Sequence, residues 1–279
     1  MNRLKPVDAL VGAVCAMAAV LSVGALLWIV LDLVKMGTSQ IDWEFLTSGV
    51  EESGRAGGIG PVIKSTLLIL MCCLLVAIPF GVGCAFWITE MVSPGSRLTA
   101  WLTRSVDLLA SIPSIVFGLF GMAFFCRILG LGFSILSGGL TLACMILPIL
   151  IRTTLAAVQS LPPDLRLSAT AMGLRKSTIL SRVLLPRAFP GILIGFTIGV
   201  ARALSETAAL IFTSGYATRS PASLLDSGRS ISVHIFDMAM NVPNGATRAS
   251  ASALVLLLVI LMINYLANYF SDQWLKKVN

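Results

Sequence analysis

Charged side chains are scarce in this sequence of 279 residues. Only 12% of the residues are Asp, Glu, Lys or Arg, whereas 57% are hydrophobic. A soluble domain is roughly half apolar and about one-quarter charged. The mean hydropathy of +0.92 is also that of a chain rich in apolar segments. The scarcity of charge therefore excludes an ordinary soluble domain and predicts an all-α integral membrane protein.

Residues that form metal sites and catalytic centres are also few. His234 is the single histidine, so a His-x-x-x-His metal motif cannot form, and no Gly-x-Ser-x-Gly nucleophile elbow of a catalytic triad is present. The six cysteines show no Cys-x-x-Cys spacing and lie mostly in apolar runs, where we interpret them as small core residues. For His234 we favour a packing or loop role. The sequence thus predicts no enzymatic activity and no bound metal or cofactor.

A nucleotide-binding P-loop is missing as well. The segment Lys176 to Thr178 reads Lys-Ser-Thr, like the end of a P-loop, but Arg175 stands where that motif needs glycine. The chain contains no Gly-Lys dipeptide anywhere. If ATP and Mg drive this protein, a separate polypeptide must bind and hydrolyse the nucleotide.

Long apolar runs are what the sequence does contain. Six of them approach the roughly 20 residues that a helix needs to cross a bilayer. The expected spans are residues 9–34, 61–89, 100–125, 134–158, 189–214 and 249–270. The first run is longer than the apolar core of a signal peptide, so we predict an uncleaved span. Pro79, Pro113 and Pro148 interrupt these runs and predict bent helices.

The basic residues indicate the orientation of these spans. Positive charge is concentrated on the cytoplasmic side of membrane proteins. A cytoplasmic N-terminus places twelve lysines and arginines inside and seven outside, which favours both termini in the cytoplasm. The net charge of +7 then belongs to membrane topology, and no nucleic-acid partner is expected. The predicted organisation is a first span with an outer loop (1–60), a five-helix core (61–270) and a cytoplasmic tail (271–279).

A cytoplasmic loop, residues 159–189, separates the fourth and fifth spans and has helical patterning of its own. Asp164 is placed to cap a helix that begins at Leu165. Leu167, Ala171 and Leu174 would share one face of this helix. Gly173 suits the sharp turn that follows, and a second helix should lead back to the membrane.

This loop resembles the "EAA" coupling loop of ABC importer permeases, whose pattern is Glu-Ala-Ala, three residues, Gly, nine residues, Ile, any residue, Leu-Pro. Ala169, Gly173, Val183, Leu185 and Pro186 fall on that spacing. Leu167 and Ser168 replace the family's glutamate and first alanine. The resemblance implies a type I, MetI-like permease core whose loop docks on an ATPase.

Three further segments extend the resemblance over essentially the whole chain. They read "IPSIVFGLFG" (112–121), "ARALSETAALIFTSG" (201–215) and "ISVHIF" (231–236). Together they are similar to the PstA-type permeases of phosphate-specific ABC importers. The resemblance implies a PstC-like permease partner, two PstB-like ATPase subunits and a PstS-like binding protein that delivers inorganic phosphate. It also implies a cell (inner) membrane location, within lipid.

Arg202 and Glu206 stand four residues apart inside the predicted fifth span. That spacing places both side chains on one helix face near mid-membrane, where Glu206 can neutralise Arg202. A buried arginine there is costly and marks a candidate pathway residue, and its planar fork fits phosphate oxygens. We expect Arg202 to bind phosphate in alternation with Glu206. The alternative is a purely structural ion pair.

Two other charges lie close to membrane depth. Arg152 either reaches the cytoplasmic interface or lines the phosphate pathway. Asp107 is expected to pair with Arg104, three residues earlier on the same helix. The hydroxyl of Ser205 can either bond back to its helix or face the path.

Other functions remain open at this point. One alternative is an ABC permease for phosphonate, molybdate or sulfate. Another is a stand-alone channel or secondary transporter, which would have no use for a coupling loop.

Overall fold

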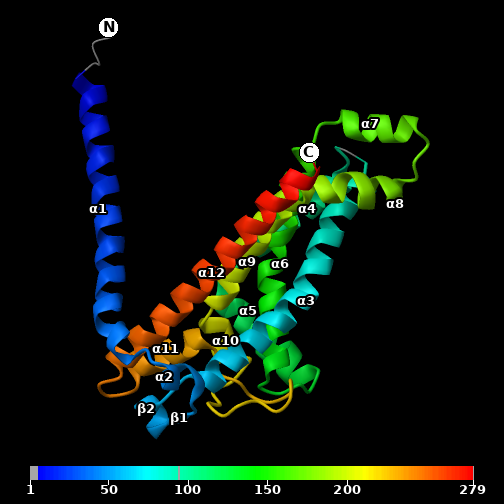
Figure 1. Cartoon of the computed structure of the whole chain (residues 1–279). Coiled ribbons are helices and arrows are strands. Elements are labelled where there is room, and N and C mark those ends of the chain that lie inside the picture. Colours follow the sequence, from blue (N-terminus) through cyan, green and yellow to red (C-terminus); the bar gives the residue numbers. More distant parts are fainter. Residues whose placement is uncertain (1–5, 94, 279) are drawn as a thin grey trace.

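The computed structural model describes residues 6–93 and 95–278 and is built mainly of helices (Figure 1). The long helices run between the two ends of the molecule. They are α1 (Pro6–Gly37), α3 (Gly60–Glu90), α4 (Arg97–Ser111), α6 (Ile135–Gln159), α9 (Leu185–Leu204) and α12 (Ala246–Val278). Apolar side chains dominate each of them except the amphipathic α4, which is consistent with helices that pack in or cross a membrane.

Shorter elements connect the long helices. The helical ones are η1 (Thr38–Gln40), α2 (Trp43–Thr47), η2 (Glu52–Gly54), α5 (Ser114–Gly121), the π-helix η3 (Met122–Ile128), α7 (Asp164–Ala171), α8 (Lys176–Thr178), the π-helix η4 (Ile179–Leu184), α10 (Ala208–Ile211) and α11 (Ile231–Met240). Strands β1 (Val50–Glu51) and β2 (Ala56–Gly57) form a small antiparallel pair in which Val50 faces Gly57.

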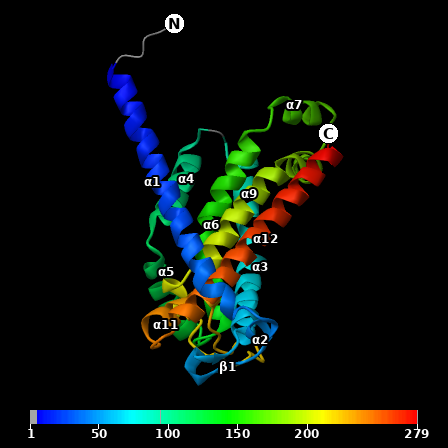
Figure 2. The same ribbon diagram turned by 60° about the vertical axis from the view of Figure 1, so that its left-hand side comes forward.

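The two ends of the molecule differ in character. Figures 1 and 2 show α7, α8, the start of α1 and the last turns of α12 at one end, which we call the loop end. The opposite end, which we call the distal end, carries α2, β1, β2, α10 and α11. The described start of α1 and the last described turns of α12 therefore lie at the same end, as the predicted topology requires.

The described residues contain five helices long and apolar enough to cross a membrane, or six if one bent pair counts as a single span. The predicted second, fourth and sixth spans agree closely with α3, α6 and α12. Pro79 and Pro148 lie inside α3 and α6, which continue through them.

The third span is bent far more sharply than the sequence indicates. The helix of residues 97–111 and the one of residues 114–128 meet at 95°. Ile112 and Pro113 form the break, and proline cannot supply the N–H that would continue the first helix. The bend predicted at Pro113 is therefore confirmed, but the run 100–125 forms two separate helices, and α5 returns toward the bundle as a short helix of its own.

The predicted fifth span is displaced along the chain. Residues Lys176–Leu204 form one continuous span through α8, η4 and α9, whereas residues 205–214 lie outside it. The expected second helix of loop 159–189 is therefore confirmed, and it continues directly into the membrane span. The expected span of 189–214 is wrong at its C-terminal end.

Small residues bring the central helices close together. An added Cβ at Gly139 of α6 would lie 2.6 Å from Cβ of Cys72 on α3. Gly191 and Gly195 of α9 face Ala157 and Thr153 of α6 in the same way. Such contacts are typical of helix packing in membranes, where close backbone approach replaces the hydrophobic effect. The buried core therefore lies among α3, α6, α9 and α12.

Helix α1 is the exception to this packing. Its described residues from Leu10 to Asp32 are all exposed, and only its last turns meet α12, where Gly37 approaches Ala251 and Leu254. An apolar helix with this much uncovered surface requires lipid or another apolar chain around it.

Candidate functional site

Arg202 lies close to the distal end of the fifth span, two residues before α9 ends at Leu204. It is exposed on the surface of this chain. Among the residues that the structure describes, no carboxylate lies within ion-pair distance of its guanidinium. The side chain therefore presents an uncompensated positive charge on a membrane helix.

The predicted ion pair between Arg202 and Glu206 does not form. Glu206 lies beyond the end of α9 and is buried, with 8% of its surface exposed. Its Oε1 accepts the N–H of Ala209 at 3.1 Å, and its backbone carbonyl accepts the hydroxyl of Ser232. Because these bonds take the place of further helical turns, the four-residue spacing no longer puts the two side chains on one face. Glu206 fixes the junction between α9 and α10 and leaves Arg202 free.

Arg202 belongs to an uncovered stripe of α9. Ile194, Ile198 and Arg202 follow one another at four-residue spacing and are exposed, whereas Gly195 and Gly199 on another face pack against α6. This stripe is the part of the fifth span that the chain itself does not bury. It is available to a solute path or to a second subunit.

A groove of about 410 Å³ runs beside this stripe between α9 and α12. It is lined by Thr197, Ile198, Ala201, Asn264 and Asn268. Hydroxyl and amide groups are costly to expose to hydrocarbon and are found where water, solute or another protein meets them. The polar groove and the guanidinium therefore lie on the same uncovered side of the chain, which is the candidate functional site.

Two short helices meet next to the end of α9. Gly118 of α5 lies so close to α10 that an added Cβ would be 2.8 Å from Cα of Ala209. Gly121 similarly faces Thr213 and Thr141. Neither α5 nor α10 is long enough to cross a membrane alone. They join the break in the third span to the end of the fifth, close to Arg202 and Glu206.

Arg152 of α6 pairs with Asp107 of α4, with Nη2 2.7 Å from Oδ1. The contact is an ion pair without a well-aligned hydrogen bond. The predicted pair between Asp107 and Arg104 is therefore wrong. Asp107 pairs with Arg152 because α4 faces α6 at this point. Both side chains remain about half exposed, so the pair adds little to stability but ties the first half of the broken span to the core.

In loop 159–189 the predicted turn is confirmed in detail. Gly173 has a φ of +72°, its N–H bonds to the carbonyl of Thr170, and the N–H of Leu174 bonds to the carbonyl of Ala169. These two bonds form a Schellman motif, which ends α7 with glycine in the left-handed conformation. Asp164, predicted as the cap, is instead the first residue of α7 and makes no capping bond.

An ion pair anchors α7 to the core. Arg166 donates from Nε to Oε1 of Glu90 at 3.0 Å and from Nη2 to the carbonyl of Val158 at 3.1 Å. Ala169, on the inner face of α7, is buried in a cluster with Phe86 and Leu184. Glu90 ends α3 and Val158 lies near the end of α6, so any displacement of α7 acts directly on two membrane helices.

The opposite face of α7 is uncovered. Leu167 and Met172 are 66% and 71% exposed, and Ser168 lies beside them. Leu167, Ala171 and Leu174, which were predicted to share one face of this helix, are all exposed, and the buried residue of α7 is Ala169. Val183 lies in η4, and Leu185 and Pro186 begin α9, with the carbonyl of Pro186 accepting the indole N–H of Trp274 at 2.8 Å. The loop therefore offers an apolar surface on a firmly held helix.

Replacing Gly173 should loosen the end of α7. A valine there would meet open space but would have to adopt a φ of +72°, which costs roughly 1–2 kcal/mol for a residue with a Cβ. We expect the amides at the end of α7 to exchange hydrogen about tenfold faster in Gly173→Val. Gly173→Asn is the control, because asparagine tolerates this conformation. Equal exchange rates in all three proteins would contradict the assignment of the turn.

One buried ion pair at the distal end was not predicted from the sequence. Arg229 Nη1 lies 2.8 Å from Oδ2 of Asp237, both side chains are largely buried, and the guanidinium stacks over Tyr216. Asp237 directly follows "ISVHIF", which was the available signal. The pair fastens α11 to the segment that follows α10.

His234 lies in α11 next to this pair and is 2% exposed, which agrees with a packing role. Burial, with Arg229 and Arg248 nearby and Asp237 opposing them, lowers its pKa from 6.5 to about 4. The unfolded chain therefore binds a proton near pH 6.5 that the folded chain does not. The contribution of neutral His234 to the free energy of unfolding is therefore fully present above about pH 6.5. It decreases as the pH falls toward 4, and the loss is about 2 kcal/mol at pH 5.

The melting temperature of the purified protein in detergent measures this effect. It should fall between pH 7 and pH 5, and His234→Gln should remove most of the decrease. An identical pH dependence in the variant would show that His234 is not its source.

The family of the chain follows from comparison with known proteins. Residues 77–277 match the family described as binding-protein-dependent transport system inner membrane component. The chain belongs to this family. It is therefore an ABC importer permease of the MetI-like type, which accounts for the loop between the fourth and fifth spans.

Two relatives align over nearly their whole lengths. The probable ABC transporter permease protein YqgI of Bacillus subtilis is 29% identical over 296 residues, covering 100% of this chain and 99% of the relative. Phosphate transport system permease protein PstA 2 of Mycobacterium bovis is 28% identical over 277 residues, covering 97% of this chain and 91% of the relative.

Among solved structures, a chain of the bacterial alginate ABC transporter in complex with an alginate pentasaccharide-bound periplasmic protein has the same fold. The TM-score is 0.72 at 19% identity, with 95% of each chain covered. At this identity the similarity concerns the fold alone, and the neighbour's substrate differs from that of the phosphate permeases.

Proposed function

We propose that the chain is the PstA-type permease subunit of an importer that moves inorganic phosphate into the cytoplasm. The observation that carries the proposal is the free guanidinium of Arg202, on an uncovered stripe of the fifth span, in a chain aligned end to end with a phosphate permease. Guanidinium presents a planar set of donors that matches phosphate oxygens and keeps its charge at any working pH.

In this proposal Arg202 is a transient phosphate ligand. Because no described carboxylate neutralises it, an incoming anion meets an unoccupied positive charge. Glu206 then acts as a positioning residue that ends α9 beside Arg202, and it does not compete for the guanidinium. Arg152, held by Asp107, would support the broken third span and would not bind phosphate directly.

The partners follow from the family and from the loop. A PstC-like permease would cover the stripe of α9. Two PstB-like ATPase subunits would bind ATP and Mg, and one of them would dock on the exposed face of α7. A PstS-like protein would deliver phosphate from the distal side. The loop end and both termini would then face the cytoplasm, with the chain in the cell (inner) membrane.

ATP hydrolysis by the reconstituted four-component complex tests the substrate. Inorganic phosphate with its binding protein should stimulate hydrolysis, whereas sulfate, molybdate and phosphonate should not. If only one of the other oxyanions stimulated hydrolysis, that oxyanion and not phosphate would be the substrate. Failure of the chain to associate with an ATPase and a second permease would contradict the subunit assignment itself.

A further inference from the structure

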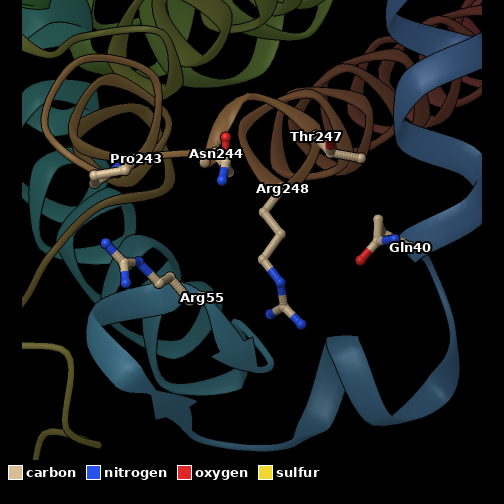
Figure 3. Close-up of a pocket in the computed structure, with 7 residues that line it drawn as sticks. Gln40, Arg55, Pro243, Asn244, Thr247 and Arg248 are labelled. Carbon is tan, nitrogen blue, oxygen red and sulfur yellow. The ribbon is translucent and has the colours of Figure 1, made fainter.

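A polar pocket at the distal end is not part of the proposed path. It has a volume of about 380 Å³ and is lined by Gln40, Arg55, Pro243, Asn244, Gly245, Thr247 and Arg248. Three separate chain segments form it, namely η1, the turn between η2 and β2, and residues 243–248, which are the turn before α12 and the first residues of that helix (Figure 3). None of the lining residues is acidic, and the two charged ones are both arginines.

Arg248 is held in place by the protein. Its Nη1 donates to the backbone carbonyl of Gly57 at 2.6 Å, and the side chain is half-buried. Figure 3 shows the guanidinium extending into the space between the segments, with Gln40 on one side and Arg55 on the other. A guanidinium has five N–H donors, so four remain after the bond to Gly57.

Arg55 adds a second charge without a countercharge. Its guanidinium makes no hydrogen bond or ion pair within the part of the chain that the structure describes. At the same end, Asp42 caps α2, Asp226 accepts two backbone N–H groups, and Asp237 pairs with Arg229. Glu44, Glu51 and Glu52 are exposed and form no ion pair with Arg55 or Arg248 within the described chain. Arg55 and Arg248 line the same pocket, so an anion bound there would be attracted by both positive charges.

The uncharged lining residues also favour an anion. Gln40, Asn244 and Thr247 can each donate a hydrogen bond from a side chain. The pocket lies at the first turn of α12, whose N–H groups have no acceptor within the helix and carry partial positive charge. The donors therefore surround the pocket from several directions.

We propose that this pocket binds a tetrahedral oxyanion, inorganic phosphate or sulfate, at a second site separate from Arg202. Four acceptor oxygens match donors from three directions better than the two oxygens of a carboxylate do. The site would hold the anion at the distal end of the chain. This inference does not rest on the proposed function, because a pocket that binds phosphate does not depend on which solute crosses the membrane.

Equilibrium binding of radiolabelled inorganic phosphate tests the pocket. The assembled complex is placed in lipid nanodiscs without its binding protein, and every preparation carries Arg202→Gln, so that the path residue does not contribute. We expect saturable binding in this background. Arg55→Gln and Arg248→Gln should each weaken it about tenfold or more, the usual effect of removing a charged donor.

Arg219→Gln is the matched control, because Arg219 is an exposed arginine at the same end that does not line the pocket. The affinity of this variant for phosphate should stay within about twofold of that of the complex that carries only Arg202→Gln. Arg55→Gln is the cleaner test variant, since it removes no bond within the described chain. Absence of saturable binding in the background, or equal affinities in all variants, would overturn the proposal. The proposal would also be overturned if Arg55→Gln bound phosphate normally but captured the binding protein more weakly. The arginines would then be a docking contact for that protein.

Discussion

Arg202→Gln should lower ATP-driven phosphate uptake by about tenfold or more, because it removes the charged donor that we propose as the phosphate ligand of the fifth span. Arg202→Lys should give intermediate uptake, since lysine keeps the charge but loses the planar fork. The variant complex should assemble normally, because Arg202 has no ion pair to lose among the described residues.

Arg104→Gln serves as the control for this experiment. Arg104 is an exposed arginine of α4 that makes no ion pair with any described residue. Uptake should be close to normal in this variant. If uptake were also normal in an assembled Arg202→Gln complex, Arg202 would not be a phosphate ligand.

Gly118→Leu should destabilise the chain by about 3 kcal/mol and abolish transport. A single Cβ at this position would already lie 2.8 Å from Cα of Ala209, and the backbone of α10 cannot move away without disturbing the end of α9. Overpacking of this kind typically costs about 1–3 kcal/mol. The melting temperature in detergent and phosphate uptake in vesicles measure the two effects.

Gly83→Leu is the matched substitution on a membrane helix. An added Cβ at Gly83 of α3 has no atom within 4 Å, so the larger side chain should be tolerated. Equal melting temperatures for the two variants would show that α5 and α10 are not packed as described.

The membrane helices were predictable where apolar character and length agree. The runs that became α3, α6 and α12 are continuous, and their limits follow from the residues that interrupt them. The break in the third span was less accessible. Pro113 and Pro148 both stand in apolar runs, yet only the first lies at a break, because flanking contacts decide whether a helix continues through proline.

The ion pairs of the candidate site could not be predicted from spacing along the sequence. The spacing of Arg202 and Glu206 predicts an ion pair only if the helix continues. Here Ser232, 26 residues further along the chain, bonds to the carbonyl of Glu206 and helps end the helix. Asp107 likewise pairs with Arg152 on another helix and not with the nearer Arg104. Contacts between elements therefore override local spacing.

Loop 159–189 was largely readable, because its turn depends on one glycine. Gly173 has the left-handed conformation that its position between two helices predicts. The face of α7 that packs inward was not readable, since Leu167 is exposed and the smaller Ala169 is buried. A helix that docks on another protein keeps large apolar residues outside, so apolar character alone does not indicate which face is buried within the chain.

Uptake of radiolabelled phosphate into vesicles that contain the assembled complex is the most direct test of the central claim. The account predicts ATP-dependent uptake that requires this chain, its permease partner, the ATPase and the binding protein together, and that falls about tenfold or more in Arg202→Gln. Phosphate uptake by this chain alone, without ATP, would contradict it.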